Sequence, residues 1–196
     1  MGQDIKEMEK ISKELCFKNP ACSKIQLILM ATLFFSFLFN LNFVFADDIS
    51  ISAGYGFALF NPESKPYRLR YTKGLYDFYH VSLARENPIY GQFYLVAEPF
   101  LTYQARPSEG IDLGFVLSGK HYITKNFYMN IGVGIAYTTY GFKEQGTHLP
   151  FIIQAGVGYR WKGIFIEDRF KHYSNGGLLR PNMSINANII LIGIYI

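Results

Sequence analysis

Two side chains near the end of the sequence are of the right types to perform nucleophilic chemistry together. His172 and Ser174 are separated by one residue, and on a β-strand residues two apart point the same way, about 6.6 Å from one another. A serine hydroxyl is a poor nucleophile until a neighbouring base removes its proton, and an imidazole can be that base. A His and a Ser at this spacing also occur as ordinary polar residues at a strand end. The pair therefore indicates an esterase only if the surrounding elements bring both side chains to an ester bond.

Other chemistries leave no comparable pattern in the sequence. It contains no HExxH, P-loop, CxxC or G-x-S-x-G motif, and none of its G-x-G pairs completes a dinucleotide-binding fingerprint. His80, His121 and His148 are scattered, with no carboxylate at metal-ligand spacing. We therefore expect these histidines to be surface or interfacial residues, and we expect the protein to need no metal and no organic cofactor.

The first 46 residues have the layout of a targeting segment. A polar head with five lysines precedes an apolar run over 25–45, and the small residue Ala46 comes directly before Asp47. We interpret 1–46 as a signal peptide with an unusually long head and 47–196 as the mature domain. A single transmembrane anchor is the alternative, because about 20 apolar residues can span a bilayer.

The composition of the mature domain excludes two classes of function. Removing the first 46 residues leaves 14 basic residues (19 less 5) and 11 acidic residues (15 less 4), a net charge of about +3. This excess is too small to predict nucleic-acid binding. Cys16 and Cys22 both lie in the targeting segment, so we expect no disulfide and no thiolate chemistry in the mature domain.

Apolar residues recur with a period of two along the mature domain, which is typical of β-strands. In the first such segment Ile49, Ile51 and Ala53 alternate with the small residues Ser50 and Ser52. The pattern predicts eight strands, at 48–60, 67–75, 92–104, 110–122, 127–140, 149–161, 163–173 and 183–196. The intervening stretch 76–91 is too long for a tight turn, and only 77–86 within it has a helical period.

Eight strands of this length fit either a soluble lipocalin-like barrel or an outer-membrane barrel, and the apolar faces distinguish the two. In the seventh strand Glu167, Arg169 and Lys171 share one face while Ile164 and Ile166 share the other. Charges of alternating sign can pair inside a narrow lumen while the apolar face meets lipid. With 27 aromatic residues in the mature domain (34 less 7), many near strand ends, interfacial girdles are also expected. We predict an all-β fold, an eight-stranded antiparallel transmembrane β-barrel of the outer membrane.

This barrel places the His–Ser pair near the outer leaflet. With the N-terminus in the periplasm, the connections after the first, third, fifth and seventh strands face outward. His172 and Ser174 belong to the lipid-facing side of the seventh strand. His172 lies nine steps from the inner turn, which is about 30 Å along a strand and, at a tilt near 45°, about 21 Å of a band about 25 Å tall. A catalytic pair at this height would meet lipid ester bonds directly.

The segment around the pair, H-Y-S-N-x-G-L-x-x-P-N at 172–182, resembles the C-terminal motif of the PagL family of outer-membrane lipid A 3-O-deacylases. The resemblance extends more weakly over the rest of the mature domain. It implies that Ser174 is the nucleophile and His172 its general base. It also implies that donors near Asn175 and Gly177 hold the tetrahedral intermediate, with Asn182 organising the loop.

The sequence departs from the family motif at the residue that orients the histidine. Family members carry a Glu twelve residues after the Ser, and Asn186 occupies that position here. Residues 172 and 186 are equidistant from 179, so the hairpin pairs them. An amide oxygen can fix the imidazole tautomer but carries no full charge, so we expect a slower enzyme. Asp168, about 13 Å from His172, is too far to replace the Glu unless a β-bulge lies near 169–171.

By this resemblance the partner is lipid A in lipopolysaccharide, in an outer membrane, with the active site facing the outer leaflet. Five basic residues near the outward ends are candidates for contacts with its phosphates, namely Lys65, Arg68, Lys143, Lys171 and Arg180; ordinary solvated loop charge is the alternative. A homodimer is left open. The competing function is that of a non-catalytic small barrel of the OmpA or OmpX type, serving adhesion or membrane integrity.

Overall fold

The computed structural model describes residues 48–60, 76–106, 109–139, 147–178 and 184–196. These form eight strands: β1 (Asp48–Phe60), β2 (Asp77–Tyr90), β3 (Phe93–Arg106), β4 (Gly110–Tyr122), β5 (Phe127–Thr138), β6 (Phe151–Trp161), β7 (Ile164–Ser174) and β8 (Ile185–Tyr195). The described ranges contain no helix that is long and apolar enough to span a membrane. The predicted targeting segment, 1–46, lies outside the described residues.

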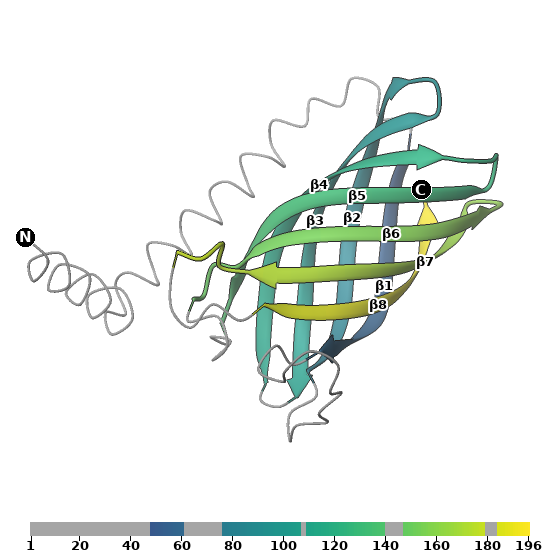
Figure 1. Cartoon of the computed structure of the whole chain (residues 1–196). Helices are drawn as coiled ribbons and strands as arrows, with labels where there is room; N and C mark the ends of the chain where they lie inside the picture. The colour runs from purple at the N-terminus through teal and green to yellow at the C-terminus, as the bar shows by residue number, and fades with distance from the viewer. Residues whose placement is uncertain (1–47, 61–75, 107–108, 140–146, 179–183) are drawn as a thin grey trace, which may run out of the picture. The chain divides into compact units, whose positions relative to one another are not determined.

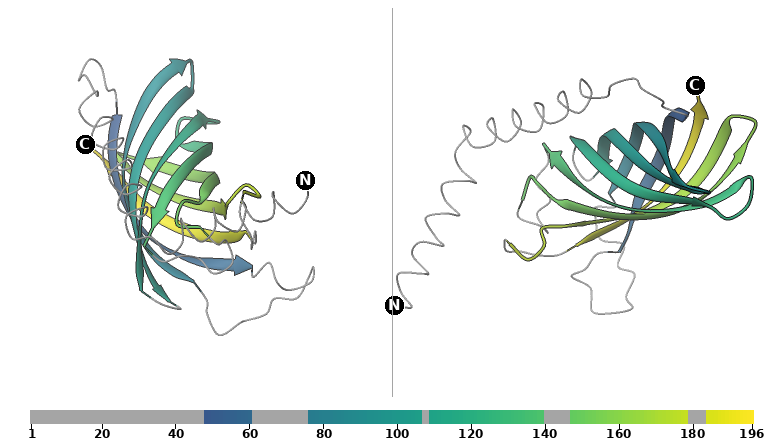
Figure 2. Two further views of the ribbon diagram at one scale, coloured as in Figure 1. Left: turned by 90° about the vertical axis from the view of Figure 1, so that its left-hand side faces the viewer. Right: turned by 90° about the horizontal axis from the view of Figure 1, so that it is seen from above.

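The strands form a closed antiparallel barrel in which each pairs with its neighbour in the chain and β8 pairs with β1 (Figure 1; Figure 2). Closure leaves no sheet edge with unpaired backbone groups, which is the condition for a β-structure to cross a bilayer. One end of the barrel carries the short connections β2–β3, β4–β5 and β6–β7 together with the start of β1 and the end of β8. We call this the turn end, and the opposite end the loop end.

The structure corrects the prediction for the second strand. The predicted strand at 67–75 lies outside the described residues, and β2 runs through the segment that was interpreted as a connection with a helical turn. The outward residues Tyr79, Val81 and Leu83 are apolar, but the inward positions combine Phe78 with His80, Ser82 and Glu86. This mixture hid the period of two. With β2 in its observed place, the β2–β3 connection is a tight turn in which Gly91 has a φ of 56°, a conformation that favours glycine.

The outer surface of the barrel is apolar, with aromatic residues toward both ends. Exposed aliphatic side chains line the middle, including Val81, Leu117, Ile131, Val133, Ile153, Ile166 and Ile192. Tyr55, Tyr79 and Tyr103 form a row of neighbouring rings near the loop end, and Tyr90 and Trp161 are exposed at the turn end. This distribution matches a lipid-facing wall with two interfacial girdles.

A cluster of apolar side chains lies in the loop half of the lumen. Buried here are Tyr76, Phe78, Phe100, Val116, Ala136, Ile152, Tyr173, Ile185 and Ala187. Two predictions are corrected in this region. His80 is buried beside Phe100 rather than interfacial, and Lys171 is fully buried with its Nζ 3.7 Å from the centre of the Phe100 ring. Lys171 therefore cannot reach a lipid phosphate. The other four proposed phosphate contacts lie outside the described residues.

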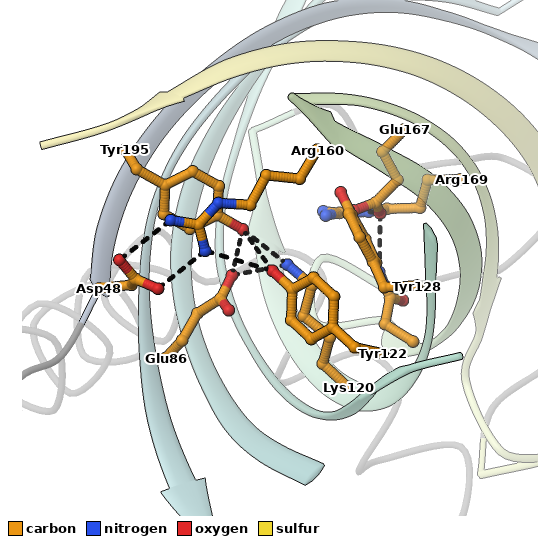
Figure 3. Close-up of polar contacts among 10 residues, drawn as sticks. Asp48, Glu86, Lys120, Tyr122, Tyr128, Arg160, Glu167, Arg169 and Tyr195 are labelled. Carbon is orange, nitrogen blue, oxygen red and sulfur yellow. Dashed lines mark hydrogen bonds and ion pairs between the residues drawn. The ribbon is translucent and has the colours of Figure 1, made fainter. Parts of the chain in front are cut away.

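The turn half of the lumen is held by paired charges, as the alternating signs on the seventh strand predict (Figure 3). Arg169 donates to Glu98 and to Glu167, each at 2.6 Å. Nearer the turn end, Lys120 Nζ and the Tyr195 hydroxyl both donate to Glu86 Oε1. Because every one of these charged groups has a hydrogen-bonded partner, they can be buried together.

Glycines on the lumen side make room for aromatic rings from neighbouring strands. A Cβ at Gly158 would lie 2.2 Å from the Tyr128 ring, and a Cβ at Gly114 would lie 2.3 Å from the Phe100 ring. Such separations are far below van der Waals contact, so any side chain at these two positions would displace a ring. The glycine-rich strands thus allow bulky rings to fill a narrow lumen.

Candidate active site

His172 and Asn186 are paired across β7 and β8, as the symmetry of the hairpin about residue 179 predicts. The His172 Nδ1 and the Asn186 Oδ1 are 2.7 Å apart. An amide oxygen only accepts hydrogen bonds, so Nδ1 carries the hydrogen and donates it. The lone pair of the imidazole is then on Nε2, and His172 is held in the tautomer that a general base requires.

Ser174 lies on the same face of β7, two residues beyond His172. The intervening Tyr173 and the preceding Lys171 are buried in the lumen, whereas His172 and Ser174 are only partly buried. The strand therefore presents the His–Ser pair on its outer, lipid-facing side. The Ser174 Oγ accepts a hydrogen bond of 2.9 Å from the backbone N–H of Gly176. A hydroxyl that accepts in this way can still donate its own hydrogen to an imidazole nitrogen.

The turn that follows Ser174 is organised by its own side chains. Asn175 is buried, and its Oδ1 accepts the N–H of Gly177 at 2.8 Å. Gly176 and Gly177 have φ values of 64° and 79°, where residues with a Cβ are strained. The two N–H groups therefore bond within the turn, one of them directly to the Ser174 oxygen. Asn182 lies outside the described residues.

β7 contains no β-bulge, so His172 and Ser174 both point to the outer face of the barrel. The register with β6 is continuous from Ser174 opposite Phe151 to Ile164 opposite Trp161, and the register with β8 is also continuous. Asp168 is therefore four residues below His172 on the same face and does not contact it. Instead its Oδ1 accepts a hydrogen bond of 2.7 Å from Asn188 Nδ2.

Two residues of this region were not singled out from the sequence. Gly176 was missed because its contribution is a backbone N–H, which no residue type signals, although two glycines directly after S-N indicate an unusual turn. Asn188 was missed because its contact with Asp168 runs diagonally across the hairpin, since Asp168 pairs directly with Ile190. The hairpin register that predicted the Asn186 contact would have identified Asn188 as well.

The described residues contain no group of three or more His, Cys, Asp or Glu side chains that could hold a metal ion. The side chains brought together on the outer face of β7 and β8 are instead a base of defined tautomer, a hydroxyl and an amide. Such a set can perform nucleophilic acyl transfer.

A closed barrel of eight antiparallel strands with an apolar outer wall and paired charges in its lumen defines the class as outer-membrane β-barrels. Within this class the chain belongs to the lipid A 3-O-deacylase (PagL) family, whose model matches residues 67–195. The protein is therefore located in an outer membrane. No curated protein sequence matches the chain.

The fold resembles that of a solved outer-membrane enzyme. The crystal structure of the outer membrane enzyme PagL is 20% identical, with a TM-score of 0.56, and the match covers 75% of this chain and 98% of that one. Neisserial surface protein A is 9% identical with a TM-score of 0.48, covering 76% and 95% of the two chains. The protein Ail of Yersinia pestis is 10% identical with a TM-score of 0.46, covering 76% and 99%.

Proposed function

We propose that this protein hydrolyses the ester bond that links a 3-hydroxyacyl chain to position 3 of lipid A. The observation that carries the proposal is the hydrogen bond between His172 and Asn186 beside Ser174, on the outer wall of the barrel. A base held in the correct tautomer next to a hydroxyl has no evident structural purpose on a surface that faces lipid. Membership of the lipid A 3-O-deacylase family supports the choice of substrate.

In the acylation step, Ser174 Oγ attacks the carbonyl carbon of the ester while its proton passes to His172 Nε2. The tetrahedral intermediate collapses when the bond between that carbon and the oxygen of the sugar breaks. The same proton moves from Nε2 to the departing oxygen. The products are an acyl-enzyme on Ser174 and a free hydroxyl at position 3 of lipid A.

In the second step, water attacks the acyl-enzyme and His172 takes its proton. The bond between the acyl carbon and Ser174 Oγ breaks, and Nε2 returns the proton to the serine. The released product is a 3-hydroxy fatty acid. Both steps use only side chains and water, so the proposed reaction needs no cofactor.

The charge that develops on the carbonyl oxygen requires donors already in place. The Gly176 N–H is 2.9 Å from the nucleophilic oxygen, so the new oxyanion forms close to it. The N–H of Gly177 becomes a second donor if it leaves Asn175 Oδ1. Asn175 and Asn182 keep the roles that the family motif implies, as residues that organise the loop and its donors.

The position of the site supports a substrate in the outer leaflet. Counted from the turn end, His172 lies about 21 Å up an apolar band about 25 Å tall. We propose that the loop end faces the cell exterior, after removal of residues 1–46 on export, so that the site opens toward lipid A. Asn186 fixes the imidazole but brings no charge, and it makes the enzyme slower than one with a carboxylate there.

The decisive experiment incubates the purified full chain with lipid A and follows the products by mass spectrometry. We expect loss of one 3-linked hydroxyacyl chain and release of the free fatty acid. Ser174→Ala and His172→Ala should each abolish the loss. Glu109→Gln, an exposed residue between β3 and β4, is a matched surface control. Deacylation that survives in both site variants contradicts the mechanism, and an inactive wild-type protein favours a non-catalytic barrel of the OmpA or OmpX type.

A further inference from the structure

A carboxylate on the lipid-facing wall of β7 needs an explanation. Asp168 is exposed on the outer face, between Ile166 and Phe170 on its own strand. It lies about five steps above the β6–β7 turn, which is about 12 Å of height and close to the middle of the apolar band. An ionisable side chain at that depth costs free energy, and such residues in membranes usually serve a function.

The surroundings of Asp168 do not neutralise it. The cross-strand neighbours on the two adjacent strands are Val157 of β6 and Ile190 of β8. Its hydrogen-bond partner is the amide of Asn188, and among the described residues no basic side chain forms an ion pair with it. Arg169, next in the chain, points into the lumen and bonds to glutamates there. Asp168 therefore has a dipolar partner but no counter-charge.

The one group nearby that becomes positively charged during the proposed reaction is the imidazole of His172. Asp168 and His172 share the outer face of β7, about 13 Å apart along the strand. The amides of Asn186 and Asn188, two residues apart on the outer face of β8, bond to His172 and to Asp168 respectively. These four side chains form a polar row on the outer face, between apolar neighbours.

We propose that Asp168 is a positioning residue that supplies, from a distance, the negative charge that Asn186 cannot supply. The inference rests on the proposed function. When Ser174 transfers its proton to His172 Nε2, the imidazolium forms in the field of the Asp168 carboxylate, which takes no proton itself. At an effective dielectric constant of about 20, two unit charges about 13 Å apart interact strongly enough to change a rate about tenfold.

Asp168→Asn tests this directly, because the amide keeps the size of the side chain and can still accept from Asn188, while the charge is removed. We expect kcat for lipid A to fall about tenfold, with KM unchanged within twofold. The rate of labelling of Ser174 by an alkyl fluorophosphonate, which reports nucleophile activation without lipid A, should fall by the same factor. The unfolding midpoint should rise, since a charge has left the lipid-facing wall.

The same substitution in an Asn186→Glu background separates a charge effect from a structural one. With a carboxylate in contact with His172, the distant charge becomes redundant, and Asp168→Asn should then change kcat less than twofold. Equal losses in the two backgrounds, or no loss in either, would overturn the proposal. Glu109→Gln, which removes one negative charge elsewhere, should leave both readouts within twofold of the wild-type values.

The two readouts also distinguish this proposal from the proposed function. If Ser174 labels with the expected dependence on Asp168 while lipid A stays intact, the substrate assignment fails and the role of Asp168 is supported. If lipid A is deacylated but Asp168→Asn has no effect, only the role of Asp168 fails. A wild-type chain that neither labels nor deacylates would overturn both.

Discussion

Polar residues lie on both sides of the barrel wall, and their environments differ. In the lumen, Arg169 is buried between two glutamates that accept its hydrogen bonds. On the outer face of the same strand, His172 has a single amide partner and remains partly exposed. Arg169, Glu98 and Glu167 bond to one another inside the barrel, whereas His172 and Ser174 lie on the outer face beside the lipid. Under the proposed mechanism, accessibility to substrate separates catalytic from structural residues better than charge does.

The largest expected effect tests the role of the outer face of β7. Ser174→Ala should lower the rate of lipid A deacylation at least about 10³-fold, because the nucleophile is removed. The free energy of unfolding in urea should change by less than about 0.5 kcal/mol, since the hydroxyl is partly exposed and near a strand end. A large loss of stability would mean that Ser174 is a structural residue like those in the lumen.

The second prediction tests the lumen. Arg169→Met leaves Glu98 and Glu167 buried without their cation and should lower the free energy of unfolding by about 3–5 kcal/mol. Deacylation per folded molecule should stay within about threefold of wild type, as measured on protein whose folding is verified by heat-modifiable migration. Lys125→Met, an exposed turn residue, is the control and should be close to neutral. A variant that stays fully stable but inactive would reverse the assignment of roles.

The third prediction concerns the orientation of the base. Asn186→Leu removes the hydrogen-bond acceptor of His172 Nδ1 and should lower kcat on the order of 10²-fold, because the tautomer and ring orientation are no longer fixed. Stability should be nearly unchanged, as leucine is well tolerated on a lipid-facing surface. Steady-state kinetics on the purified chain measure this effect. Unchanged kcat would show that the bond seen between the two residues has no part in catalysis.

The smallest expected effect tests how tightly side chains pack in the lumen. A methyl group at Gly158 would collide with the Tyr128 ring, so Gly158→Ala should lower the free energy of unfolding by about 1–3 kcal/mol. At Gly119, on the outer face of β4, a Cβ meets nothing within 4 Å, and Gly119→Ala is the matched control. Urea unfolding of the two variants gives the comparison. Equal stabilities would contradict the tight packing of the lumen.

Much of the fold could be predicted from the sequence, because the alternation of side chains is a local property of an extended chain. Seven strands lie within a few residues of the predicted ranges. The interpretation of 76–91 as a connection was wrong, because the lumen side of β2 mixes Phe78 with His80, Ser82 and Glu86. A lumen residue needs only a suitable partner across the barrel, and those partners are distant in the sequence.

The candidate site was predictable to a similar extent. The contact between His172 and Asn186 follows from counting along one hairpin, and the structure contains it. The backbone donor of Gly176 and the diagonal contact of Asn188 depend on turn conformation and side-chain direction, which residue types do not reveal. The catalytic roles of His172, Ser174 and Asn186 stay predictions until the variants are assayed.

By itself the sequence determined the properties that arise between neighbours along the chain: the strand period, the pairing within the last hairpin, and the motif that carries the family resemblance. Only the tertiary structure decided which charges meet inside. Arg169 donates a hydrogen bond to Glu98, 71 residues away in the sequence, and Arg160 donates one to Asp48, 112 residues away. Such contacts depend on closure, because the width of the lumen and the stagger of the strands bring distant inward side chains together. The same closure turns every second residue of β7 toward lipid, where His172 and Ser174 can meet a substrate.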